Sequence, residues 1–151
     1  MMAEQQNNLF WENCKFGKVE EVREALQAGA DPNTTRGILN STCLMEAASY
    51  NHDEVLALLL AAGADVNAKS KYNNTALHFA CRGGSLAILS KLLAAPGVQL
   101  NERDTMGQTP IMEAILQGQT EAVRQMAAVR EVDLDVKDTG GRSLEEIAPN
   151  R

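Results

Sequence analysis

The side chains that could carry out acid–base or metal chemistry are few in this chain. His52 and His78 are its only histidines, and it contains no His-Glu-x-x-His, Cys-x-x-Cys or Gly-rich phosphate-binding motif. Adjacent carboxylates such as Glu20 and Glu21 point to different faces of a helix, so they predict solvated surface rather than an acid–base pair. We therefore expect no cofactor, no metal or nucleotide site, and no enzymatic activity.

The three cysteines, Cys14, Cys43 and Cys81, predict buried, reduced thiols. An odd number cannot all pair within one chain, and each cysteine lies in an apolar, helix-like context. Reduced cysteines are typical of a reducing compartment, so we expect a cytoplasmic or nuclear protein.

The composition describes an acidic protein built around aliphatic side chains. The 151 residues are 44% hydrophobic but only 4% aromatic, and the formal net charge is −6. This length suits one compact domain or one short repeat array, and the negative charge disfavours general binding to nucleic acid or anionic membranes. The first ten residues, MMAEQQNNLF, lack the regions of a secretory signal, and no apolar run is long enough to span a bilayer. We expect no nucleic-acid partner, no membrane association, and a chain that is monomeric alone.

A unit of about 34 residues repeats along the chain and must position any functional side chain. The pattern Gly-Ala-Asp-x-Asn at residues 29–33 returns at 63–67, with weaker copies at 97–101 and 131–135, so the starting points are 34 residues apart. Thr42, Thr75 and Thr109 recur in phase with these copies, and Ser143 takes the same place in a truncated fifth copy. Repetition in constant phase predicts a stack of similar units.

Each unit is predicted to contain two short helices followed by a turn. The threonines are placed to cap the first helix, and Pro110 lies at a first-turn position where its missing N–H is not needed. Asn51, Gly84 and Gly118 tolerate a left-handed backbone and separate the two helices. The second helix carries an apolar stripe that one unit cannot bury alone, so stability must come from stacking on neighbouring units.

These motifs resemble the ankyrin-repeat family, whose Thr-Pro-Leu-His-x-Ala signature is similar to Thr75-Ala76-Leu77-His78-Phe79-Ala80. The resemblance covers roughly residues 8–148. It implies an all-α fold, an ankyrin-repeat solenoid of stacked helix-turn-helix units with projecting β-turn or hairpin loops, in which His78 hydrogen-bonds within or between the turns. We predict a single domain over residues 1–151, with a cap repeat at 5–35, units at 36–68, 69–102 and 103–136, and a C-terminal cap at 137–151.

The resemblance also implies that a protein partner binds to the projecting turns, here called fingers, and to the first helices, which line a concave face. The finger positions are Arg36, Ile38, Leu39, Ser41, Lys69, Lys71, Tyr72, Asn74, Arg103, Thr105, Met106 and Gln108. The first-helix positions are Glu46, Ser49, Tyr50, Phe79, Arg82, Glu113, Leu116 and Gln117. We expect an adaptor, scaffold or inhibitor that works through protein–protein interaction.

Apolar side chains on the fingers indicate where such a partner would make contact. Ile38, Leu39, Tyr72 and Met106 are predicted to form an exposed patch of the kind that marks protein interfaces. Tyr72 is the better anchor because it is large and amphipathic. We expect Ile38 or Leu39 to fold back over the neighbouring turn.

The central part of the chain is locally basic. Residues 68–101 contain Lys69, Lys71, Arg82 and Lys91 and no acidic residue. A basic stripe in an acidic molecule predicts a partner with an acidic segment, because complementary charge steers association. Chance clustering is the alternative interpretation.

The resemblance implies a modification site as well. Asp65-Val66-Asn67-Ala68, with Leu59 upstream, is similar to the ankyrin turns that asparaginyl hydroxylases modify, which makes Asn67 the expected target. The alternative is that Asn67 only hydrogen-bonds within the turn.

Two narrower functional alternatives stay open. Small ankyrin inhibitors of cyclin-dependent kinases have a similar length, which implies kinase inhibition as one alternative. The other is that this chain is the ankyrin portion of a larger receptor, channel or enzyme.

Overall fold

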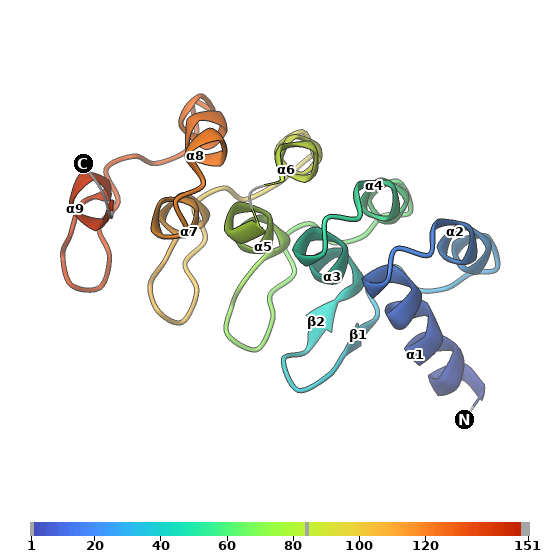
Figure 1. The fold of residues 1–151 in the computed structure, drawn as a ribbon. Coiled ribbons are helices and arrows are strands. Elements are labelled where there is room, and N and C mark those ends of the chain that lie inside the picture. Colours follow the sequence, from blue (N-terminus) through green and yellow to red (C-terminus); the bar gives the residue numbers. More distant parts are fainter. Residues whose placement is uncertain (1, 84, 149–151) are drawn as a thin grey trace.

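The computed structural model describes residues 2–83 and 85–148 and shows two rows of helices in one elongated stack (Figure 1). The inner row contains the first helix of each unit: α1 (Met2–Lys15), α3 (Cys43–Ser49), α5 (Ala76–Gly83), α7 (Pro110–Leu116) and α9 (Leu144–Ile147). The outer row contains the second helices: α2 (Val19–Gln27), α4 (Asp53–Ala61), α6 (Leu86–Leu93) and α8 (Thr120–Ala127). The predicted all-α solenoid of helix-turn-helix units is confirmed.

Side-chain caps start the first helices at the predicted threonines. Thr42 Oγ1 accepts from the Met45 backbone N–H at 3.1 Å, and Thr109 Oγ1 accepts from the Met112 N–H at 3.5 Å. Pro110 then occupies the first turn of α7. Each cap satisfies an N–H group that the helix would otherwise leave free at its first turn.

Residues in the left-handed conformation separate the paired helices, as the sequence predicts. Asn51 has a φ of 62° and Gly118 a φ of 69°. Gly84, expected to act in the same way, lies outside the described residues. At Gly17 φ is +71°, and a Cβ atom there would lie 2.5 Å from Nδ1 of His52, so both backbone and space require glycine.

The core runs continuously along the stack because each unit buries apolar side chains against the next. In the inner row, Ala47 and Ala80 are 0% exposed, and their small side chains let neighbouring helices approach closely. In the outer row, Leu59 and Leu92 are 0% exposed. Burying such a leucine stabilises the fold by about 1.5–3 kcal/mol, so the inter-unit contacts dominate stability.

The connections between units project from one side of the stack as fingers (Figure 1). The first finger contains two short antiparallel strands, β1 (Thr35–Arg36) and β2 (Ser41–Thr42). Backbone hydrogen bonds join neighbouring fingers: the Lys71 N–H donates to Leu39 O at 2.8 Å, and the Thr105 N–H donates to Tyr72 O at 3.0 Å. These bonds fix the spacing between successive fingers.

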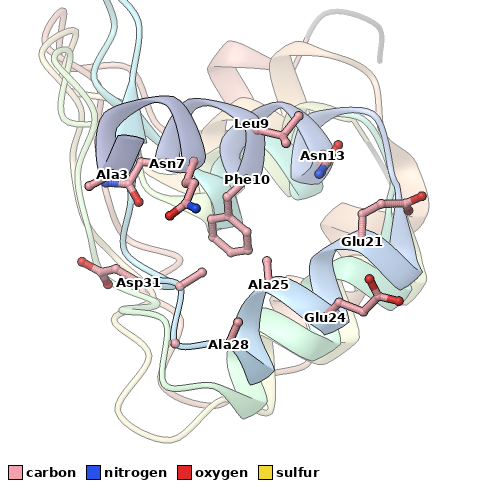
Figure 2. A pocket seen from close by; sticks show the side chains of 13 residues that line it. Ala3, Asn7, Leu9, Phe10, Asn13, Glu21, Glu24, Ala25, Ala28 and Asp31 are labelled. Atoms are coloured by element: carbon pink, nitrogen blue, oxygen red, sulfur yellow. The ribbon is translucent and has the colours of Figure 1, made fainter. Parts of the chain in front are cut away.

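The N-terminal unit has polar residues where internal units bury apolar ones. Asn13 takes the place of the buried Ala47, and Glu21 takes the place of the buried Val55. A hollow of about 590 Å³ opens between α1 and α2 at this end, with the Phe10 ring pointing toward α2 (Figure 2). A polar outer face is what a terminal unit of a repeat stack requires.

The short helix α9 covers the other end of the inner row. Ile147 is 5% exposed and packs in one cluster with Met112 and Val136. Ile147 thus provides apolar cover for α7 that the next full unit provides elsewhere in the stack.

We predict that Ile147→Ala lowers the free energy of unfolding by about 2–4 kcal/mol, because it removes buried methyl groups and leaves a cavity against α7. Urea unfolding measures this change, and hydrogen exchange should show faster exchange of α7 amides than of α3 amides. Leu134→Ala is the matched control, since Leu134 is 47% exposed. Equal stabilities for the two variants would contradict a capping role for α9.

Candidate functional site

The predicted partner-binding residues lie on two adjoining surfaces. The fingertip row consists of Ile38, Leu39, Tyr72 and Met106, of which the last three take the same place in successive fingers. The inner face consists of the side chains that α3, α5 and α7 leave accessible: Glu46, Ser49, Tyr50, Phe79, Arg82, Leu116 and Gln117. The fingers and the inner row lie on the same side of the stack (Figure 1).

All four side chains of the fingertip row are exposed. Ile38 is 89% exposed, Met106 69%, Tyr72 50% and Leu39 44%. The expectation that Ile38 or Leu39 folds back over the neighbouring turn is wrong. The contact of Leu39 with the next finger is made by its backbone, since its carbonyl accepts from the Lys71 N–H.

The other predicted positions vary in accessibility. Exposed side chains are Tyr50, Lys69, Lys71, Arg103, Thr105, Leu116 and Gln117. Half-buried side chains are Arg36, Glu46, Ser49, Phe79, Arg82 and Gln108. Ser41, Asn74 and Glu113 are buried. The fold therefore brings most of the predicted positions to one side of the molecule but withdraws three of them from contact.

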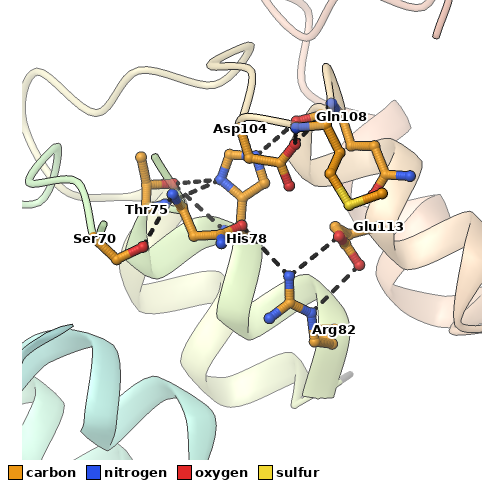
Figure 3. A network of polar contacts seen from close by, with 9 residues as sticks. Ser70, Thr75, His78, Arg82, Asp104, Gln108 and Glu113 are labelled. Carbon is orange, nitrogen blue, oxygen red and sulfur yellow. Dashed lines mark hydrogen bonds and ion pairs between the residues drawn. The ribbon is translucent and has the colours of Figure 1, made fainter. Parts of the chain in front are cut away.

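His78 links two units at the centre of the stack (Figure 3). Its Nδ1 accepts from the Thr75 backbone N–H at 3.1 Å, so the ring proton must sit on Nε2, which donates to Gln108 O at 2.9 Å. The side chain is 0% exposed and both ring nitrogens are bonded. The predicted hydrogen-bonding role within and between turns is confirmed for this residue.

The environment of His78 keeps its ring neutral. Burial lowers the pKa of His78 below its ordinary value, although the hydrogen bond to Gln108 O opposes the shift. Protonation at Nδ1 would also replace the acceptor that the Thr75 N–H requires. His78 thus acts as a neutral clamp between units.

Arg82 is held by acceptors from two units, which corrects the expectation that Asn74 and Glu113 contact a partner. Its Nη2 donates to Glu113 Oε1 at 3.1 Å and to Asn74 Oδ1 at 3.4 Å (Figure 3). Asn74 is 9% exposed and Glu113 is 6% exposed. Both side chains serve to hold Arg82, because a buried carboxylate is stable only with a paired charge and hydrogen bonds.

Ion pairs neutralise most of the predicted basic stripe. In addition to Arg82, Lys69 Nζ lies 2.7 Å from Glu102 Oε2, and Lys91 Nζ lies 3.5 Å from Asp53 Oδ2. Of these four cations, Lys71 alone lacks an ion pair within residues 2–83 and 85–148, and binding of an acidic segment stays a prediction. The partners come from outside residues 68–101, so a count within that window could not include them.

Asn67 connects two successive turns of the stack. Its Oδ1 accepts from the Gln99 N–H at 2.8 Å, and its Nδ2 donates to Gly97 O at 2.8 Å. Asn33 and Asn101, at the same place in neighbouring units, accept from backbone N–H groups in the same way. The hydrogen-bonding role of Asn67 is confirmed, and its hydroxylation stays a prediction.

Trp11 is a structural link that the sequence analysis missed. Its indole Nε1–H donates to Ser41 O at 2.9 Å, as His78 donates to Gln108 O in a later unit. Trp11 and His78 take the same place in their units, so extending the repeat alignment to the first unit would have found this bond. Met45 takes this place in the second unit, and its side chain has no N–H to donate.

The cysteines have the properties of inert core residues. Cys14, Cys43 and Cys81 are each buried, and none of the three forms a disulfide. A hydrogen bond with Cys14, followed by burial, raises the pKa of the Cys43 thiol above its usual range, and burial raises the pKa of the Cys81 thiol to about 12. Thiols that stay protonated are poor nucleophiles, in agreement with the structural role predicted for them.

Over residues 2–83 and 85–148, His, Cys, Asp and Glu side chains form no group of three or more that could hold a metal ion. In the same residues, every helix is too short or too polar to cross a membrane.

A stack of helix pairs with fingers on one side, joined by a continuous apolar core and by hydrogen bonds between units, defines a solenoid repeat protein. A family profile described as "Ankyrin repeats (3 copies)" matches residues 44–138. The chain belongs to the ankyrin-repeat family. Ankyrin repeats are generally protein–protein interaction modules, and the family is typically non-catalytic.

A curated relative matches part of the chain. Over 74 residues, this chain is 46% identical to the "Ankyrin repeat and KH domain-containing protein mask-1" of Caenorhabditis elegans. The matched stretch is 48% of this chain and 3% of that protein, so the chain is similar to a small part of this relative.

We predict that the stability of the stack falls as the pH drops below about 6.5. The pKa of His78 is lower in the folded chain than in the unfolded chain, where it is about 6.5. As the pH falls below 6.5, protons therefore bind the unfolded chain more tightly, and the stability is lost until the pH reaches the pKa of the folded state. Urea unfolding between pH 7.5 and 5 measures this loss. His78→Met introduces the methionine that the second and fourth units carry at this place. In this variant, the part of the pH dependence that comes from His78 should disappear. The same pH dependence in both proteins would contradict the assignment.

We also predict that an asparaginyl hydroxylase adds one oxygen atom to Asn67, which peptide and intact-mass analysis would detect. Asn33 and Asn101 are internal controls, because their turns lack the Val-Asn-Ala sequence. Both ends of the Asn67 amide are bonded, so the turn must open first and modification should be slow in the folded chain. An unchanged mass after exposure to the active enzyme would rule the modification out.

Proposed function

We propose that this chain is an adaptor or inhibitor that binds a protein partner across the fingertip row and the inner face. The observation that carries the proposal is the exposure of Ile38, Leu39, Tyr72 and Met106 along three neighbouring fingers. Contiguous exposed apolar side chains mark interaction sites, and Tyr and Met are enriched in protein interfaces.

The rigidity of the fingers supports this proposal. The backbone bonds from Lys71 to Leu39 and from Thr105 to Tyr72 hold the three tips in fixed relative positions before a partner arrives. A surface that is already ordered loses less conformational entropy on binding. The fingertip row therefore suits a partner with a complementary, preformed groove or ridge.

The charges of the fingers favour mainly apolar contact. Lys71 Nζ lies 5.9 Å from the centroid of the Tyr72 ring, and within the described ranges 2–83 and 85–148 it has no ion-pair partner. An acidic group of the partner would therefore meet Lys71 beside Tyr72. Lys69 and Arg82 are less available because they already pair with Glu102 and Glu113.

Affinity capture from a cell lysate tests the proposal, with the wild-type chain, a Tyr72→Ser/Met106→Ser variant and a Leu134→Ser control as baits. We expect proteins retained by wild type and control to be lost from the fingertip variant, because truncating a central anchor commonly weakens binding by 1–4 kcal/mol. Leu134 is exposed but lies between α8 and α9, away from the fingertip row. The same proteins retained on all three baits would refute a fingertip interface.

A further inference from the structure

Three aromatic rings surround one ammonium group at the N-terminal end of the inner face. Lys15 Nζ lies 5.5 Å from the centroid of the Trp11 ring, 5.6 Å from that of Phe16 and 5.7 Å from that of Tyr50. Each distance is within the range over which a cation is attracted to an aromatic face. Trp11, Phe16 and Tyr50 are called the aromatic cage below.

The cage is built by two neighbouring units, and contacts within the fold hold Trp11 and Tyr50 in place. Trp11 and Lys15 lie one turn apart on α1, Phe16 follows α1 directly, and Tyr50 ends α3. The His52 ring stacks on Tyr50 with centroids 6.5 Å apart, and His52 Nε2 is bonded to Lys15 O at 2.8 Å. These contacts join the end of α1 to the end of α3.

The cage is accessible from solvent. Trp11 is only 9% exposed and forms its floor, whereas Phe16 is 62% exposed and Tyr50 is 51% exposed. These two large aromatic side chains therefore contribute little to the core of this chain. A ligand that covers them would bury apolar surface as well as gain cation–aromatic attraction.

The cage suits an ammonium group that carries few N–H bonds. Within residues 2–83 and 85–148, the Lys15 ammonium has no ion-pair partner, and aromatic faces offer no oxygen lone pair to its N–H groups. A primary ammonium therefore leaves its donors to water when it enters the cage. A trimethylated ammonium has no N–H to satisfy and presents methyl groups to the rings, so it gains more from the same site.

Carboxylates on the same helical faces complement a positively charged ligand. Glu12 lies four residues before Phe16, and Glu46 lies four residues before Tyr50, so each is next to a wall of the cage. Arg36 lies 5.9 Å from the Trp11 ring and pairs with Glu12 at 2.5 Å, so this pair adds no net charge. Glu46 has no ion-pair partner within residues 2–83 and 85–148, although its Oε1 accepts from Ser41 Oγ at 2.6 Å, so its negative charge is the one that favours a cation.

From this geometry we propose that the aromatic cage recognises a methylated lysine of the protein partner, and that Lys15 occupies the cage in the unbound chain. The inference rests on the proposed function, since it assigns a ligand chemistry to one end of the inner face. Lys15 competes with the ligand, so its removal increases the fraction of chains with an empty cage.

Fluorescence of Trp11, the single tryptophan of the chain, reports directly on the cage. The titrants are a peptide with trimethyllysine between small neutral residues, the same peptide with unmodified lysine, and choline. We expect the trimethyllysine peptide to bind at least about threefold more tightly than the unmodified peptide and than choline. In Lys15→Ala its affinity should rise by at least about threefold.

Two wall variants and one matched control complete the test. Phe16→Ala and Tyr50→Ala should each weaken peptide binding by about threefold or more, whereas Leu134→Ala should have no effect. Leu134 is a suitable control because it is 47% exposed and lies between α8 and α9, far along the stack from α1 and α3. Thermal melting of each variant establishes that it is folded.

Several results would overturn the proposal. They are equal binding of methylated and unmodified peptides, no gain in Lys15→Ala, or equal losses in Leu134→Ala and the wall variants. Binding of choline as tight as that of the peptide would show a small-molecule site instead. Failure of these titrations is distinguishable from failure of the proposed function, because the capture experiment changes only Tyr72 and Met106 and leaves the cage intact.

Discussion

The structure depends on the fact that no helix pair in this chain can bury its own apolar face. Ala47, Leu59, Ala80 and Leu92 lose all exposure only because the next unit lies against them. Stability is therefore a sum of contacts between neighbours, and the two ends need different solutions. At one end Glu21 makes the outer face polar, and at the other a single short helix covers the inner row.

Polar links between units are unevenly distributed along this stack. The Trp11 indole and the His78 ring each donate to a carbonyl of the following finger, at 2.9 Å in both cases. Met45 and Met112 take the same place in the second and fourth units, and their side chains contribute packing without donating a hydrogen bond. Of the four residues at this place, only His78 has a titratable side chain, and its bond to Gln108 O lies at the contact between the third and fourth units.

Because stacking supplies the stability, side chains on the fingers and inner face are free to differ between units. Some of this freedom is used internally, as in the pairing of Arg82 with Glu113. The rest leaves two distinct exposed features on the same side of the molecule, the fingertip row in the centre and the aromatic cage at the N-terminal end. A partner long enough to contact both would be bound by apolar anchors and by recognition of one cation. The fingertip side chains, Phe16 and Tyr50 are exposed, so substitutions of these residues should change binding more than folding, whereas Trp11 also belongs to the core.

The sequence by itself determined the repeat, the helix pairs, the threonine caps and the family, because capping and apolar spacing are local patterns that recur in every unit. It also identified the four apolar fingertip residues. Only the tertiary structure decided that Asn74 and Glu113 are buried, that Lys69 and Lys91 are paired, and that Lys15 lies among three rings. Most of these outcomes depend on contacts between side chains about one repeat apart in the chain, such as Arg82 with Glu113, Lys69 with Glu102 and Lys15 with Tyr50. The stacking distance between units, not the local sequence, sets which of these side chains meet.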